Sequence, residues 1–225
     1  MNTNTRPQDD SPNGWPAWRP LFHGCVRQSL GAVSSVARIG TQGTNAWERP
    51  FAYVADDNQG NVGVVEFRVD GAVGAVIAHT PKRRFDLARA IDLAPPTVRD
   101  ALVRVCDLPL LQEGPGVPTG VSAVFWTIGE FIQSSESWRD TCLSEVFEAE
   151  LLGDSAWETE GTRYFGLAPG VANLIIAIAR RAVVRAPMVT LSDRELRQLV
   201  PKASKHEDEA LNLLTSEGLF EIAPG

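Results

Sequence analysis

The chain has 225 residues, of which 44% are hydrophobic and 22% are charged. A chain of this length and apolar content can bury the core of one large domain or two small ones, which excludes global disorder. Its 28 acidic residues outnumber its 21 basic residues and give a formal net charge of -7. Proteins that bind nucleic acid or anionic membranes by broad electrostatic attraction carry the opposite sign, so the composition disfavours both partners.

The cysteines Cys25, Cys106 and Cys142 are too few and too widely spaced for a disulfide framework or a zinc motif. We therefore expect reduced thiols, no metal and no cofactor. Residues 1–20 lack the apolar run of a signal peptide, and the most apolar stretch, Val171–Ala179, is too short to cross a bilayer. These features predict a cytoplasmic protein without a membrane partner.

The first predicted element is an amphipathic helix that follows a mobile tail at residues 1–20. Apolar residues recur there at spacings of four, three and four residues, which places them on one helical face. They are Val26, Leu30, Val33 and Ala37.

A meander of antiparallel strands is predicted next, over residues 51–79. Apolar side chains alternate in direction along this stretch, and Asp70-Gly71 is typical of a two-residue hairpin turn. Gly63 and Gly74 interrupt the strands and indicate bulges or close backbone contacts.

The middle of the chain is predicted to be mainly helical. Thr97 and Asp100 have the spacing of a helix cap, and Ser137 and Asp140 are placed to open a later helix. The stretch Val121–Ile132 is apolar on nearly every side, so it fits either a buried helix or a buried strand, and periodicity alone does not decide between them.

The C-terminal segment has the clearest signals for where its helices begin and end. Ser192 with Glu195, and Ser204 with Glu207, each have the spacing of a capping box. Gly218 suits the left-handed position at the end of a helix. Short strands are expected just before the first box and just after this glycine.

The predicted order of this segment is helix, strand, helix, tight turn, helix, strand. With the residues VTLSDRELRQLVPKASKHEDEALNLLTSEGLFEI, it resembles a winged-helix domain over about residues 168–222. The resemblance implies a fold and brings no catalytic residue with it. In a DNA-binding member the second capped helix would enter the major groove, but here that helix opens with Glu207, Asp208 and Glu209, which would repel phosphate.

These elements predict an α+β protein. We expect a small antiparallel β-meander with packed helices, followed by a helical, winged-helix-like C-terminal unit. The corresponding division is a mobile tail at 1–20, the meander with its helices at 21–115, a helical middle segment with an acidic face at 121–167, and the winged-helix-like unit at 168–225.

The acidic surplus is concentrated in Glu130–Glu160, which holds nine acidic residues and one basic residue, Arg139, for a net of -8. A solvated helix face would account for it. A docking surface for a basic protein is the functional interpretation, because clustered carboxylates speed association with a positive surface and aromatic residues anchor interfaces. The residues proposed for this surface are Glu136, Trp138, Asp140, Glu145, Glu148 and Trp157.

Other candidate sites are weaker. Lys82, Arg83 and Arg84 form a small basic patch that would suit an anion, or simply lie in a loop before a helix. Cys25 with His23, and Cys142 with His79, would be nucleophile and base pairs, but neither has a local catalytic signature.

We therefore expect a non-enzymatic protein that binds a basic protein partner, in one form an immunity or inhibitor protein that masks a basic toxin or effector. A winged-helix transcription regulator and an enzyme of unrecognised class are the two alternatives. Nucleic acid is the less favoured partner, and a homo-oligomer is compatible with the sequence.

Overall fold

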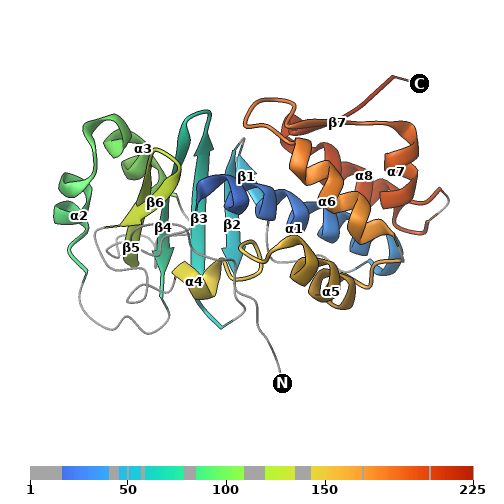
Figure 1. Ribbon diagram of the computed structural model, residues 1–225, viewed down its shortest axis with the longest axis horizontal. Coiled ribbons are helices and arrows are strands. Elements are labelled where there is room, and N and C mark those ends of the chain that lie inside the picture. Colours follow the sequence, from blue (N-terminus) through green and yellow to red (C-terminus); the bar gives the residue numbers. More distant parts are fainter. Residues whose placement is uncertain are drawn as a thin grey trace. The chain divides into compact units, whose positions relative to one another are not determined.

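The protein is an α+β protein in which an N-terminal helix precedes an antiparallel meander and further helices follow (Figure 1). This agrees with the fold class predicted from the sequence. The structure is a computed structural model. It describes residues 17–40, 46–49, 51–56, 59–78, 85–108, 120–134, 143–168, 170–202 and 204–224.

The chain divides into two compact units, each built from separate stretches of sequence. The sheet unit contains the described residues of Gln8–Leu21 and Phe51–Glu148, and the helical unit contains those of Phe22–Pro50 and Ala149–Gly225. Helix α1 (Trp18–Ile39) begins in the sheet unit and continues into the helical unit. The two units therefore do not coincide with the consecutive segments predicted from the sequence, because each unit joins stretches that are distant along the chain.

The sheet unit is organised around strands that pair with their neighbours in chain order, all antiparallel. The register aligns Val54 with Val64, and Val64 with Ala75. Three helices belong to the same unit. The strands are β2 (Ala52–Asp56), β3 (Val62–Arg68), β4 (Gly71–Ile77), β5 (Val121–Ile128) and β6 (Phe131–Ser134); the helices are α2 (Leu87–Leu93), α3 (Pro96–Cys106) and α4 (Leu143–Val146).

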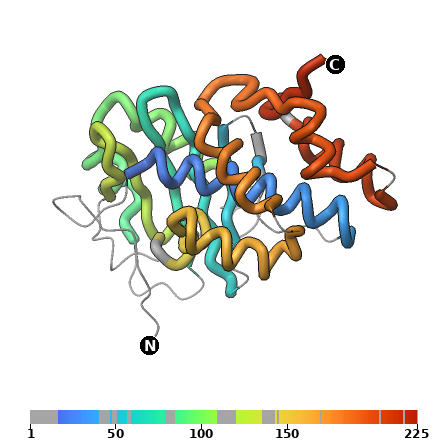
Figure 2. The backbone as a smooth tube through the Cα atoms, turned by 45° about the vertical axis from the view of Figure 1, so that its right-hand side comes forward, coloured from blue at the N-terminus to red at the C-terminus, as the bar shows by residue number. Residues whose placement is uncertain are grey.

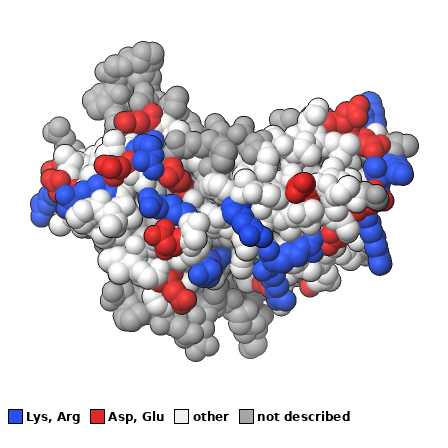
Figure 3. Space-filling model, turned by 90° about the horizontal axis from the view of Figure 1, so that it is seen from above, with Lys and Arg blue, Asp and Glu red and all other residues white. Residues whose placement is uncertain are grey.

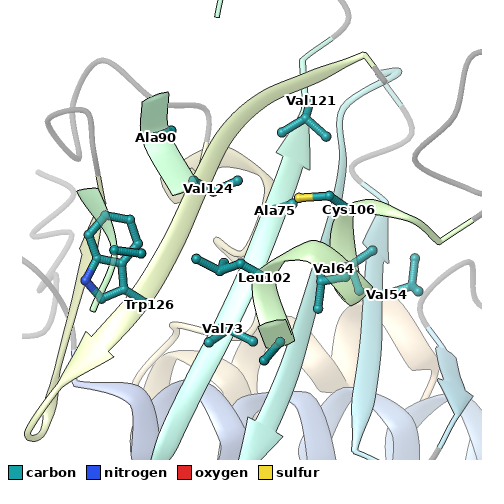
Figure 4. Packing of buried hydrophobic residues seen from close by; sticks show 13 residues of the cluster. Val54, Val64, Val73, Ala75, Ala90, Leu102, Cys106, Val121, Val124 and Trp126 are labelled. Carbon is teal, nitrogen blue, oxygen red and sulfur yellow. The ribbon is translucent and has the colours of Figure 1, made fainter. Parts of the chain in front are cut away.

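One face of the sheet forms a hydrophobic core with α2 and α3 (Figure 4). Leu102 of α3 is fully buried, and Trp126 closes the cluster on β5 with 4% of its surface exposed. The alternation of the strands sends Val64 into this core, and the next side chain on that face, Glu66, reaches Arg104 of α3 at 3.3 Å. The predicted period-two pattern of the meander is therefore the pattern of its two faces.

The opposite face of the sheet depends on two glycines. A Cβ atom on Gly63 would lie 2.7 Å from a side-chain carbon of Val146, and one on Gly74 would lie 2.1 Å from the ring of Phe125. Phe125 in turn meets Phe147 edge to face, with ring centres 6.0 Å apart. The two glycines therefore mark close contacts, which is one of the two roles predicted for them.

The helical unit contains the remaining described elements, and its C-terminal elements are coloured orange to red in Figure 2. Its strands β7 and β8 pair in parallel, with Val189 beside Phe220. The elements are most of α1, β1 (Ala46–Arg49), α5 (Asp154–Phe165), α6 (Val171–Arg181), β7 (Val189–Leu191), α7 (Asp193–Leu199), α8 (Glu207–Thr215), the short 3-10 helix η2 (Ser216–Gly218) and β8 (Phe220–Ile222).

The C-terminal elements follow the predicted order, with α6, β7, α7, α8 and β8 in succession. Ser192 and Glu195 form the predicted capping box at the start of α7. The second predicted box is wrong: α8 begins after His206, and the Ser204 hydroxyl donates instead to the main-chain oxygen of Ala37. The Ser204 oxygen accepts from the amide of His206, so this hydroxyl closes a turn before the helix and does not cap α8.

Three further local predictions change in the structure. The Thr97 cap is wrong, because α3 begins at Pro96 and has no side-chain cap. The apolar stretch Val121–Ile132 is strand, divided between β5 and β6. The turn of the β3–β4 hairpin lies at Val69-Asp70, one residue earlier than predicted, and Gly71 opens β4.

In the ranges described above, no helix is both long enough and apolar enough to cross a membrane.

Candidate functional site: the acidic segment

Glu145 and Glu148 lie on a short segment of the sheet unit whose apolar side chains hold it in place. Leu143 and Phe147 are each 1% exposed and pack into the interior. The two glutamates are exposed, and the backbone turns between them as the Glu148 amide donates to the Glu145 oxygen. Burial of the apolar positions therefore leaves these two carboxylates in solvent, as the docking hypothesis requires.

Glu150 differs from Glu145 and Glu148, because it is fully buried and belongs to the helical unit. The main chain there presses against α1: a Cβ atom on Gly24 would lie 1.8 Å from the Glu150 carbonyl oxygen. Only glycine leaves room for this approach. A carboxylate enclosed in this way cannot meet a protein partner, so Glu150 does not belong to any acidic surface.

Asp154, at the start of α5, is held by two arginines. Arg27 of α1 donates from Nη1 to its Oδ1 at 2.5 Å, and Arg180 of α6 donates from Nε to its Oδ2 at 2.9 Å. The Arg27 side chain also donates to the main-chain oxygen of Leu152 at 2.6 Å. Three segments that are distant in sequence are therefore tied together by one carboxylate.

Arg27 is the buried member of this network, with 6% of its surface exposed. Burial lowers the pKa of its guanidinium, and the Asp154 carboxylate opposes that shift. The guanidinium also lies 5.9 Å from the ring centre of Trp157, so an aromatic face covers part of the cation. Arginine suits this position because its planar group donates to several acceptors at once.

Glu158 and Glu160, which lie on α5, are exposed but engaged. Glu160 pairs with Arg163 at 2.5 Å, and Glu158 accepts a hydrogen bond from Asn173 at 2.7 Å. Acidic side chains also lie in several separate places on the face shown in Figure 3, rather than in one field. The prediction of a single acidic face over Glu130–Glu160 is therefore wrong, because Glu150 is buried and arginines neutralise Asp154 and Glu160.

Trp157 was predicted as a surface anchor, and this is also wrong. Its side chain is fully buried, with Phe165 at 6.5 Å between ring centres. A Cβ atom on Gly161 would lie 3.0 Å from its indole ring. Trp157 is therefore a core residue of the helical unit.

Several predicted site residues lie outside the described residues. Six of them belong to the proposed docking surface or to the basic patch, three to each. His79 and Cys142, which make up one of the two catalytic pairs, also lie outside the described residues. The six are Glu136, Trp138, Asp140, Lys82, Arg83 and Arg84.

The other catalytic pair is disfavoured by the state of Cys25. Its thiol is fully buried, and that burial, with the nearby Glu150 carboxylate, raises its pKa well above the usual value. A nucleophilic cysteine needs the thiolate and access to substrate. Cys25 has neither in the native fold.

A polar groove between α5 and α6 is the feature that the sequence did not reveal. It has a volume of about 270 Å³ and is lined by Asp154, Ser155, Glu158, Asn173, Ile176, Ala177 and Arg180. The only local signals were Arg27 within an apolar helical stripe and Arg180 at the end of an apolar run. Neither signal tells which carboxylate the arginine will meet.

Comparison with protein-family models, with curated proteins and with solved structures gives no match for this chain. Function has to be inferred from the residues themselves.

Proposed function

We propose that this chain is a non-enzymatic binding protein for a basic protein partner, and that Glu145 and Glu148 are its central contact residues. One observation carries the proposal: both carboxylates are exposed, and neither forms an ion pair with any described basic residue. They differ in this from Asp154 and Glu160, whose charges are taken up by arginines.

The rigidity of the segment supports this role. Val146 is buried between the two glutamates, and Phe147 is wedged against Phe125. A pair of charges on an anchored turn loses less conformational entropy on binding than a pair on a flexible loop. Exposed carboxylates of this kind mainly raise the association rate of a positively charged partner.

The partner class that follows is a protein with a basic surface. An immunity or inhibitor protein that masks a basic toxin or effector is the specific form we favour. Masking requires affinity and fast association, and it requires no catalytic group on the masking protein.

The experiment starts from the full chain as bait, and the captured partner is then purified. Association rates are measured by stopped flow at low and physiological salt for wild type and for E145K/E148K. The matched control is D92K/D100K, because Asp92 and Asp100 are exposed acidic residues on α2 and α3 of the same unit. Both double variants change the net charge equally.

We expect the association rate of E145K/E148K to fall about tenfold or more at low salt, with a smaller effect at high salt, because charge steering is screened. The control is expected to change the rate by less than about twofold. Equal losses in the two variants would mean that only net charge matters, and the proposed contact surface would be abandoned.

A winged-helix DNA-binding regulator is the second candidate, favoured by the order of elements from α6 to β8. It ranks second because Glu207, Asp208 and Glu209 open α8, and three acidic residues in the first turn of that helix would repel phosphate. Fluorescence anisotropy with duplex DNA tests it. This candidate requires salt-sensitive binding that K202E/K205E abolishes.

A further inference from the structure

The α5–α6 groove is built from two cross-links between its helices. Asp154 of α5 meets Arg180 of α6, and Glu158 meets Asn173. Asp154 comes before Glu158 on α5, whereas the partner of Asp154 comes after the partner of Glu158 on α6. The two helices are therefore antiparallel at this point. Asp154 and Glu158 are four residues apart on one helix, which separates the two cross-links by about 6 Å along its axis.

The two ends of the groove differ in charge. At one end, two guanidinium groups, those of Arg27 and Arg180, share the single carboxylate of Asp154. This end also coincides with the N-terminus of α5, whose helix dipole is positive. At the other end, the one described residue that binds the Glu158 carboxylate is Asn173, through its neutral amide. One end therefore favours an anion and the other a cation.

Hydrogen-bonding capacity remains at both ends. The Arg180 side chain is 68% exposed, and its Nε and Nη2 donate to Asp154, which leaves Nη1 without a partner among the described residues. Glu158 is exposed and uses Oε1 for Asn173, so its Oε2 is likewise without a described partner. Arg180 can therefore donate a further charge-assisted hydrogen bond at one end, and Glu158 can accept one at the other.

The middle of the groove is apolar and open. Ile176 is 6% exposed and forms its floor, and Ala177 lines it with only a methyl group although its position is exposed. A longer side chain at Ala177 would occupy this space. The groove therefore offers an anion contact, a short apolar stretch and a cation contact in sequence.

We propose that the α5–α6 groove binds a small zwitterion, with the ligand carboxylate on Arg180 and the ligand ammonium on Glu158. A few methylene groups between the two charges would lie over Ile176. All lining residues belong to the helical unit, so this site is independent of Glu145 and Glu148 in the sheet unit.

The probes are amino acids with increasing distance between amine and carboxylate: glycine, β-alanine, γ-aminobutyrate and δ-aminovalerate. Butyrate and butylamine carry one charge each and serve as ligand controls. Binding to the full chain is followed by NMR chemical-shift titration up to about 50 mM, because so small a ligand makes few contacts. We expect the tightest binding for γ-aminobutyrate or δ-aminovalerate, whose charge separation suits about 6 Å.

The single-charge probes are expected to bind at least about tenfold more weakly, because each loses one charge-assisted hydrogen bond. A177L should abolish binding by filling the groove, while A88L, at an exposed alanine of α2, should not change it. Leucine is tolerated at exposed helical positions, so both variants should fold. E158Q should weaken the zwitterions and leave butyrate unchanged, and it keeps an acceptor for Asn173.

Three results would overturn the proposal: no titratable shift with any zwitterion, equal affinity for butylamine or butyrate, or unchanged binding in both A177L and E158Q. None of these bears on capture of a basic protein by Glu145 and Glu148, so the two proposals fail separately.

Discussion

The guanidinium of Arg27 donates to the carboxylate of Asp154 across 127 residues of sequence, at 2.5 Å. This contact joins α1 to the start of α5 inside the helical unit. It removes Asp154 from the acidic surface that the sequence predicted, and it sets one end of the α5–α6 groove. Removing the arginine is therefore the most direct test of the network.

We expect R27A to lower the free energy of unfolding by about 2–4 kcal/mol, because it leaves buried acceptors and part of a carboxylate without their partner. The control is R163A, since Arg163 is 80% exposed in its pair with Glu160 and such surface pairs contribute less than about 1 kcal/mol. Urea unfolding followed by circular dichroism measures both. A similar small loss in the two variants would show that the Arg27 network is not structural.

The close contact at Gly74 predicts a packing defect in the sheet unit. In G74A the new methyl group would lie 2.1 Å from the Phe125 ring and 2.4 Å from the main-chain oxygen of Val64. The backbone oxygen cannot rotate away, so we expect a loss of about 2–4 kcal/mol in thermal or urea unfolding. G153A should cost no more than about 1 kcal/mol, because nothing lies within 4 Å of a Cβ there.

The capping box of α7 predicts an acid-dependent contribution to stability. The Arg181 side chain donates to Glu195 at 2.7 Å, and this hydrogen bond is the main reason why the pKa of the Glu195 carboxyl falls from 4.5 to about 2. A carboxyl with a lower pKa in the folded state stabilises that state above its unfolded pKa. The contribution is lost as the pH falls from 4.5 towards 2.

E195Q should therefore be less stable than wild type by about 1 kcal/mol at neutral pH, the usual size for a cap or a partly exposed ion pair. The difference should shrink below pH 4.5. Urea unfolding of both proteins at several pH values measures it. A difference that stayed constant down to pH 2 would show that the carboxyl has no lowered pKa.

The buried thiols predict low reactivity in the native state. Burial raises the pKa of Cys106 to about 12, and the pKa of Cys25 is also well above its usual value. In a C142S background, we expect iodoacetamide at mildly alkaline pH to leave both thiols unmodified without denaturant and to alkylate both in urea. Mass spectrometry counts the additions, and rapid native labelling of Cys25 would contradict its burial.

Several elements could be predicted because their signals are local. The apolar stripe of α1, the alternation over Val65–Arg68 of β3, and the box formed by Ser192 and Glu195 each depend on neighbours within a few residues. Backbone geometry alone gives these patterns their periods. Val121–Ile128 could not be assigned in this way. It is strand because β4 and β6 both pair with it, and a strand buried on both faces loses its alternation.

The fate of the carboxylates was decided only by the tertiary structure. Glu145, Glu148, Glu150 and Asp154 lie within ten residues of one another, and nothing local separates the exposed pair from the other two. Whether a carboxylate is buried depends on which residues, distant in sequence, the chain brings beside it. Asp154 meets Arg27 because the fold places the start of α5 beside α1. The sequence determines which residues carry a charge, but tertiary packing determines which group neutralises that charge.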